Sequence, residues 1–355
     1  MRFGPLEEIV RQPGVSDVAV TPDGVVWVDR GSGMVRETSV RPFRSAQAVR
    51  DFAVRLCSQM NCRLDDASPI ADGSSPEGIR VNAVIEPLVP QGAAICLRVQ
   101  PRRAPGLEEL AARGMMPVSW LPLLRGLVAG RANLLLAGPT GAGKTTLMRA
   151  LLHECPATER VVTVEEVREL GDIGVGDHVA LACREPNVEG AGGIGLSRLV
   201  RATLRMRPDR IVVGECRGSE VADLLRALGS GHRGGMTTIH ASGVKGVGPR
   251  LIALGLLAGM EPRTVTMLAA QAFDAVIHVD RVGGARRVAA VGVLGERGGV
   301  LVGDTLAQLS GGSYVAADGR GWTSFVGRWT ESSGDTGGSS QARQVVRMEG
   351  KGYGP

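Results

Sequence analysis

The feature that most constrains this chain is a glycine-rich turn between an apolar strand and a helix. The strand is predicted over Leu134–Ala137 and the helix over residues 147–152. The turn matches the pattern G-x-x-x-x-G-K-[ST] at every fixed position, through Gly138, Pro139, Thr140, Gly141, Ala142, Gly143, Lys144 and Thr145. A glycine-rich turn can match this pattern by chance, but the flanking strand and helix favour a phosphate-binding loop.

Each part of this pattern has a chemical purpose. Glycines let the backbone curl so that successive N–H groups point at phosphate oxygens, and the following helix turns its positive end toward the same anion. Lys144 can reach the β- and γ-phosphates, and the Thr145 hydroxyl can bind Mg²⁺. Together with Thr146, the residues from Gly138 onward are the predicted binding site for a nucleoside triphosphate.

Composition narrows the class of protein further. At 355 residues the chain is long enough for two domains. Aromatic residues make up only 3%, which disfavours stacking platforms for nucleic acid, so direct nucleic-acid binding is not expected. No apolar run approaches the roughly 20 residues of a membrane span, and the first residues lack the apolar core of a signal peptide. We therefore expect a cytoplasmic protein that can associate peripherally with a membrane complex.

Residues 1–100 predict a smaller N-terminal α+β domain. Its helix is expected over residues 45–62, where Val49, Phe52 and Leu56 recur at helical spacing. Its strands are predicted at residues 15–20, 25–28, 80–85 and 94–99. Residues 101–118 predict a linker that carries a short helix.

Residues 119–282 predict the larger, nucleotide-binding domain. Strand and helix signals alternate along it, which implies a parallel sheet covered by helices, an α/β fold, with ligands at the carboxyl ends of the strands. Beyond the phosphate loop, strands are predicted at residues 160–165, 211–213 and 236–240, and helices at residues 196–206 and 219–228.

After residue 282 these signals fade. Glycine pairs recur at residues 283–284, 298–299 and 311–312. Residues 283–355 therefore predict a polar, glycine-rich C-terminal extension that is partly disordered. Short strands within it, at residues 288–294 and 300–302, remain an open alternative.

Two predicted strands end in carboxylates that suit phosphate chemistry. Residues 160–165 end at Glu165, with Glu166 next, where a carboxylate can orient the attacking water. The apolar segment at residues 210–215 ends at Glu215. This position is typical of an acid near Mg²⁺ or its water shell. Solvated strand ends are the competing interpretation, and it is weaker for Glu215, which lies about 70 residues beyond the loop in a parallel-sheet context.

The strand at residues 236–240 delivers His240 to the same edge, where it can sense the γ-phosphate. A second feature is a group of arginines before Pro208, on a helix where neighbours three and four apart share a face. Like charges so placed repel each other, so they need an anion or acidic partners; phosphate across a subunit boundary and a salt-bridged surface are both possible. These arginines are Arg198, Arg201, Arg205 and Arg207.

Taken together, the motifs resemble the secretion ATPase superfamily of type II secretion, type IV pilus and type IV secretion motors. Among its branches, the chain resembles most the Tad/Flp pilus assembly ATPases, which are also described as conjugal-transfer-associated. The resemblance runs from about residue 5 to residue 282. Its specific points are residues 63–69, 80–83, 138–146, 163–166, 204–210, 213–218 and 237–241.

The resemblance implies a homo-hexameric ring in which a PAS-like N-terminal domain closes over ATP held by a RecA-like domain. It implies that Glu165 activates water, that Glu215 and Thr145 serve Mg²⁺, and that His240 belongs to a conserved histidine motif of the family. Arginines of the family act on phosphate from the N-terminal domain and from neighbouring subunits. The candidates for these roles here are Arg80, Arg98, Arg205 and Arg207.

This resemblance makes the leading hypothesis an ATP-hydrolysing motor that works with platform proteins of the inner membrane in pilus assembly or secretion. Three features depart from the family: Glu166 stands where the family often has Asp, the chain starts almost directly at the N-terminal domain, and the four-cysteine zinc element of some branches is missing. A conjugation-associated DNA-transfer ATPase is the main alternative. A nucleotide-gated scaffold with little turnover is a third.

Overall fold

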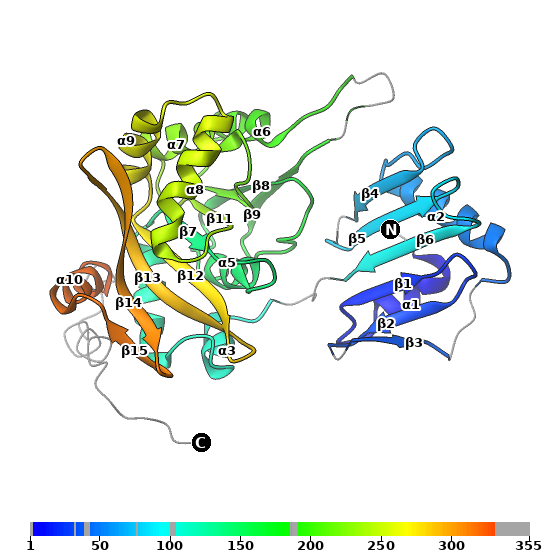
Figure 1. Ribbon diagram of the computed structural model, residues 1–355, viewed down its shortest axis with the longest axis horizontal. Helices are drawn as coiled ribbons and strands as arrows, with labels where there is room; N and C mark the ends of the chain where they lie inside the picture. Colours follow the sequence, from blue (N-terminus) through cyan, green and yellow to red (C-terminus); the bar gives the residue numbers. More distant parts are fainter. Residues whose placement is uncertain are drawn as a thin grey trace. The chain divides into compact units, whose positions relative to one another are not determined.

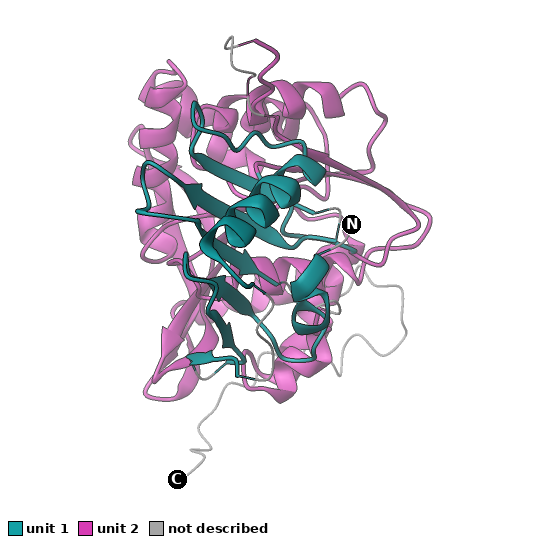
Figure 2. Ribbon diagram, turned by 90° about the vertical axis from the view of Figure 1, so that its right-hand side faces the viewer, with its two compact units in different colours: residues 1–103, 167–172 teal, residues 104–166, 173–355 magenta. Residues whose placement is uncertain are grey.

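The chain folds into two compact units. The computed structural model describes residues 3–31, 33–38, 43–75, 77–99, 104–184, 186 and 191–330. The first unit comprises Met1–Arg103 and Val167–Asp172, and the second comprises Ala104–Glu166 and Ile173–Pro355. Figure 2 colours them separately. Residues 104–118, predicted as part of a linker, thus belong to the second unit, and residues 101–103 lie outside the described part of the chain.

The first unit is built on an antiparallel sheet with the strand order β3-β2-β1-β6-β5-β4. Its strands are β1 (Asp17–Val20), β2 (Val26–Asp29), β3 (Met34–Arg36), β4 (Ile70–Ser74), β5 (Arg80–Ile85) and β6 (Ala93–Arg98). Its helices are η1 (Gly4–Leu6), α1 (Glu7–Val10) and α2 (Ala46–Gln59).

Helix α2 closes the core of this unit, because its apolar residues line one face. Val49, Phe52 and Leu56 are buried in one cluster with every second residue of the strands, the ones that point inward. Figure 2 shows the helix lying across the sheet. Ser45 begins the helix by accepting a hydrogen bond from the backbone N–H of Ala48 at 3.2 Å.

The second unit is built on a nine-stranded sheet with the order β15-β14-β13-β12-β7-β11-β10-β8-β9. Six neighbouring strands of this sheet run parallel, and they are β12, β7, β11, β10, β8 and β9. Strands β13, β14 and β15 extend the sheet beyond β12 in antiparallel pairs. The strands are β7 (Leu134–Ala137), β8 (Arg160–Glu165), β9 (Asp177–Ala182), β10 (Arg210–Val213), β11 (Met236–Ile239), β12 (Ala275–Val282), β13 (Ala285–Arg297), β14 (Val300–Ser310) and β15 (Ser313–Ala316).

Helices enclose this sheet, as Figure 1 shows. They are α3 (Leu107–Ala112), η2 (Val118–Trp120), α4 (Leu121–Ala129), α5 (Lys144–Leu152), α6 (Leu196–Thr203), α7 (Glu220–Gly229), α8 (Val244–Leu257), α9 (Pro262–Ala272) and α10 (Gly319–Thr330). Leu135 and Ala137 of β7 pack in one cluster with Leu225 of α7, Val247 of α8 and Val265 of α9. In the part of the chain that the structure describes, every helix is too short or too polar to cross a membrane.

The prediction of a glycine-rich extension after residue 282 is wrong for residues 285–330. These residues form β13, β14, β15 and α10, and the strands continue the sheet of the second unit. The glycine pairs are the turns of three successive hairpins. Both glycines of each pair have positive φ (60° and 82°, 60° and 82°, 57° and 83°), the conformation that suits tight two-residue hairpin turns. Residues 331–355 lie outside the described part of the chain.

Aromatic packing holds this C-terminal segment to the rest of the unit. The ring centroid of Trp120 lies 4.7 Å from that of Tyr314 on β15 and 5.4 Å from that of Trp322 on α10. Trp329 packs against Gly130 at the end of α4, where a β-carbon would lie only 2.8 Å from its ring. The glycine-rich composition therefore accompanies a packed structure.

Burial of His278 makes the stability of the second unit depend on pH. The side chain is 5% exposed on β12, and burial is the main cause that lowers its pKa below the usual value near 6.5. Asp280 opposes this shift, and the positive charge of Lys144 adds to it. In the unfolded chain His278 is protonated below pH 6.5, but the folded protein resists protonation. Stability must therefore fall as the pH drops below about 6.5.

We expect the denaturant midpoint of the wild-type protein to fall between pH 7.5 and pH 5.5 in the absence of nucleotide. The fall should be smaller in His278→Leu, because this variant has no imidazole to protonate at that position. Denaturant unfolding followed by circular dichroism at both pH values measures the difference. Equal falls in the two proteins would contradict the assignment to His278.

Candidate functional site

The phosphate loop connects β7 to α5 and has the backbone shape that its glycines allow. Gly138, Gly141 and Gly143 have φ values of 151°, 73° and 104°, in the region that side chains disfavour. At Gly138 a β-carbon would lie 2.0 Å from the carbonyl oxygen of Val279, so only glycine fits beside β12. The loop is therefore held by its neighbour strand as well as by its own turn.

The start of α5 provides donors for an anion. The first N–H groups of a helix lack partners within the helix, and those of Thr145 and Thr146 donate to no acceptor among the described residues. The helix dipole adds positive potential at the same place. The loop residues therefore fit the phosphates of ATP, the group that the sequence pattern implies.

Lys144 is the cation of this loop. Its ammonium group donates hydrogen bonds to the carbonyl oxygens of Gly138 at 2.9 Å and Pro139 at 3.0 Å, and its side chain is mostly buried. Its Nζ also lies 3.4 Å from Nδ1 of His240. Phosphate oxygens are stronger acceptors than neutral carbonyls, so a bound triphosphate can take over these donors.

His240 connects the lysine to a carboxylate. Its Nε2 lies 3.0 Å from Oε1 of Glu215, while its Nδ1 faces Lys144. An ammonium can only donate, so this arrangement suits the neutral tautomer in which Nδ1 accepts and Nε2–H donates to Glu215. The three predicted residues thus form one row of cation, imidazole and carboxylate.

The order of the strands explains this row. Strand β11, which ends before His240, lies between β7, which leads to Lys144, and β10, which leads to Glu215. Because parallel strands end at the same edge, their following residues meet there. Hydrogen bonds keep the three strand ends aligned: Gly138 N–H donates to the Ile239 carbonyl at 3.2 Å, and Cys216 N–H to the Thr238 carbonyl at 2.8 Å.

Glu165 lies next in the same series, at the end of β8. Strand β8 pairs with β10, and the Glu165 side chain is 4% exposed. It packs over Gly214, where a β-carbon would lie 3.0 Å from Cγ of Glu165. The predicted acid is therefore buried beside the backbone that carries Glu215. Glu166 forms an ion pair with Arg217 instead.

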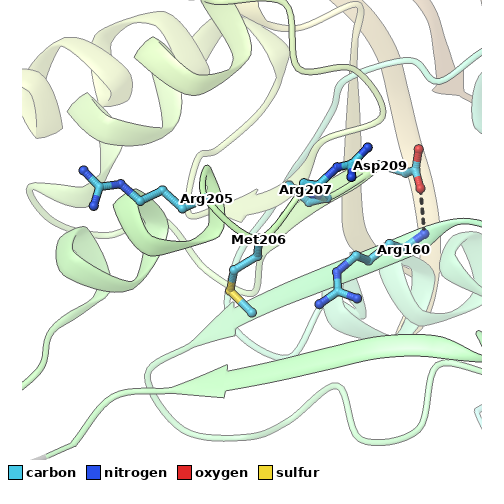
Figure 3. A pocket seen from close by; sticks show the side chains of 6 residues that line it. Arg160, Arg205, Met206, Arg207 and Asp209 are labelled. Carbon is cyan, nitrogen blue, oxygen red and sulfur yellow. Dashed lines mark hydrogen bonds between the residues drawn. The ribbon is translucent and has the colours of Figure 1, made fainter.

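Arg205 and Arg207 lie elsewhere. They line a surface hollow of about 880 Å³ together with Arg160, Met206, Pro208 and Asp209. Figure 3 shows Arg205 directed away from Arg160 and Asp209. Arg160 begins β8, and Asp209 precedes β10, so the hollow is at the amino ends of the strands, opposite the phosphate loop. Strand β10 alone separates the two edges by about 13 Å.

Within this hollow, Arg160 and Asp209 already have partners. The Arg160 guanidinium contacts Asp177 at 3.1 Å, and the Asp209 carboxylate accepts the backbone N–H of Arg160 at 2.8 Å. That hydrogen bond is the first of the causes that lower the pKa of Asp209, so the carboxylate is held in its charged form. No ion pair is found for Arg205 or Arg207 among the residues with described positions.

Arg80 and Arg98 belong to the first unit, where each has an acidic partner. Arg80 is paired with Glu169, and Arg98 lies 3.2 Å from Asp17. The two arginines face each other across β5 and β6. Their predicted contact with phosphate stays a prediction.

Sequence analysis missed residues that the fold brings to the loop. Arg281 and Arg286, on the hairpin between β12 and β13, lie against Gly141 and Gly143. No motif marks them, because their position follows from the pairing of β12 with β7. The double-glycine turn between them was the only signal in the sequence, and it was interpreted as part of an extension.

Comparison with known proteins is consistent with this geometry. The family model described as type II/IV secretion system protein matches residues 1–279. A Mycobacterium tuberculosis protein named for conjugal transfer is 42% identical over 299 residues, covering 82% of this chain and 84% of that protein. The conjugal transfer protein TrbB of Rhizobium radiobacter is 29% identical over 308 residues, covering 85% and 91%.

Among solved structures, the fold is similar to that of the pilus retraction motor PilT with bound ADP. The TM-score is 0.56 at 20% identity, covering 88% of this chain and 84% of that chain. This likeness supports a RecA-like fold for the second unit, while the family match carries the assignment. The chain therefore belongs to the type II/IV secretion system protein family, the superfamily of secretion- and conjugation-associated ATPases.

Proposed function

We propose that this protein hydrolyses ATP as the subunit of a hexameric motor that powers Tad/Flp-type pilus assembly or type II/IV-like secretion. The observation that carries the proposal is the row formed by Lys144, His240 and Glu215 at the mouth of the phosphate loop. A binding module needs the loop alone. A carboxylate joined to the loop lysine through an imidazole suits a site where the γ-phosphate is cleaved.

In this proposal, each residue at the carboxyl edge of the parallel strands has a separate role in ATP hydrolysis. Backbone N–H groups of the loop and Lys144 bind the phosphates of ATP. Thr145 and Glu215 would hold Mg²⁺ or its water shell, and this ion neutralises phosphate charge when bound. Glu165 orients the attacking water, because its buried carboxylate lies beside Gly214. His240 keeps the acid and the lysine in register and responds to loss of the γ-phosphate.

The position of the remaining arginines supports the proposal of a ring. Arg205 and Arg207 are at the amino edge of the sheet, so neither reaches the phosphate loop of its own subunit. In a head-to-tail ring, the amino edge of one copy can face the nucleotide of the next. We therefore assign Arg205 and Arg207 to the neighbouring subunit's ATP. Arg80 and Arg98 are proposed to approach phosphate from the N-terminal unit.

The family also suggests where the motor works. Type II and type IV secretion systems and pili assemble at membranes, so the proposed location is the cytoplasmic, inner face of the cell membrane. The proposed partners are inner-membrane platform proteins. Closure and opening of the N-terminal unit during hydrolysis would transmit movement to them.

Purified protein should hydrolyse ATP in the presence of Mg²⁺, and Lys144→Ala should abolish the activity by removing the cation from the γ-phosphate. Glu215→Gln should lower kcat by about 100-fold or more, because the metal-side carboxylate is lost. Phosphate release measures both rates. Glu261→Gln, an exposed acid at the start of α9, is the matched control and should retain full activity. Turnover unaffected by Lys144→Ala would contradict the proposal.

The ring is tested by mixing two inactive variants. Lys144→Ala removes the nucleotide site but keeps Arg207, and Arg207→Ala keeps the site but removes the arginine. In mixed rings, some sites receive Arg207 from a Lys144→Ala neighbour, so the mixture should recover about a quarter of wild-type turnover. Each variant alone stays inactive. A mixture as inactive as its components would argue against action across the subunit boundary.

DNA transfer is a second candidate, favoured by relatives that are named for conjugal transfer. A DNA translocase should bind DNA with an affinity that falls steeply with salt, and DNA should raise its ATP turnover. The scarcity of aromatic residues leads us to expect neither effect. Turnover measured with and without single-stranded and duplex DNA decides between the two candidates.

A further inference from the structure

The hairpin between β12 and β13 carries two arginines that face each other. Arg281 and Arg286 are direct partners in the antiparallel register, with four residues between them that include the Gly283-Gly284 turn. Side chains directly opposite each other lie on the same face, with β-carbons about 5 Å apart. The two guanidinium groups are therefore presented together.

This hairpin runs along the phosphate loop. The Val279 carbonyl passes so close to Gly138 that a β-carbon there would lie 2.0 Å away. A β-carbon at Gly141 would lie 3.9 Å from Nη2 of Arg281, and one at Gly143 would lie 3.3 Å from Cδ of Arg286. Contacts at three loop positions thus place both arginines beside the site.

Among the residues that the structure describes, no acid balances these charges. Both side chains are exposed, and neither forms an ion pair or hydrogen bond with any residue of described position. The carboxylate of Asp280, the nearest along the strand, accepts the backbone N–H of Arg281 at 2.7 Å. By contrast, Arg297, next to the equivalent Gly298-Gly299 turn, is paired with Asp304 at 2.7 Å.

Two like charges directly opposite each other destabilise a hairpin. The Lys144 ammonium adds a third positive charge to the same loop. An anion between the arginines removes this repulsion, and a guanidinium is well suited to phosphate because its planar fork can donate two parallel hydrogen bonds. The phosphate loop beside them is the proposed site of a triphosphate.

We propose that Arg281 and Arg286 form an arginine clamp that binds the phosphates of the nucleotide from the same subunit as Lys144. The proposal rests on the nucleotide site of the proposed function. It adds two positively charged side chains to that site besides Lys144. It differs from the role proposed for Arg205 and Arg207, which are assigned to the neighbouring subunit's nucleotide.

The clamp is tested by equilibrium binding of the magnesium complex of ATPγS, measured by calorimetry on the full chain. Arg281→Ala and Arg286→Ala should each weaken binding by about 10-fold, the effect of losing a charged hydrogen bond. Arg281→Lys and Arg286→Lys should restore part of the affinity. Arg297→Ala, the matched control beside the equivalent turn, should bind like the wild type. Because both arginines are exposed, melting temperatures without nucleotide should not fall.

Inorganic tripolyphosphate separates phosphate contacts from contacts to the nucleoside. If the clamp holds phosphates, the two alanine variants lose affinity for tripolyphosphate as they do for ATPγS. A loss confined to ATPγS would overturn the clamp and place the arginines on the base or sugar. Wild-type affinity in both variants, together with lost binding in Lys144→Ala, would overturn the clamp and leave the proposed function intact. A wild-type protein that binds neither probe would overturn both.

Discussion

The order of the parallel strands is the constraint on which the site depends. Strand β11 lies between the strand that leads to the phosphate loop and the strand that leads to Glu215, so His240 must lie between a cation and an anion. A neutral imidazole can satisfy both at once, by accepting from Lys144 and donating to Glu215. If β7, β11 and β10 were not neighbours in this order, Lys144, His240 and Glu215 would not meet, whatever the other residues of the chain.

The direction of the strands has a second consequence, at the opposite edge. Arg210 begins β10 fully buried and is paired with Glu159, while Arg205 and Arg207 remain at the surface just before it. The length of β10 keeps these arginines away from the phosphate loop of their own chain. The β12–β13 hairpin instead places Arg281 and Arg286 beside that loop. The fold thus holds one pair of arginines far from the loop and another pair next to it, which is the difference on which the two proposed roles rest.

The sequence predicted which side chains meet at one edge of the sheet better than it predicted the extent of the fold. Lys144 was identified from the phosphate-loop pattern, and Glu215 and His240 because each follows an apolar strand and parallel strands end at the same edge. The C-terminal strands were kept only as an open alternative, at residues 288–294 and 300–302, which lie within β13 and β14. They were not preferred because glycine pairs are common both in disordered segments and in tight hairpins, and composition does not separate the two. Arg281 and Arg286 required the register of β12 against β7, which no local pattern reveals.

The path of the chain connects the strand end that carries Glu165 to the N-terminal unit. After Glu165 and Glu166 the backbone leaves the second unit, and Val167–Asp172 belongs to the first unit, where Glu169 is paired with Arg80. The chain returns to the second unit at Ile173. The units are therefore joined near residue 103 and again directly beside Glu165. The boundary between the two units therefore lies only two residues from the carboxylate that is proposed to orient water, so a movement of the N-terminal unit, if the proposed motor works this way, would act on the backbone next to Glu165.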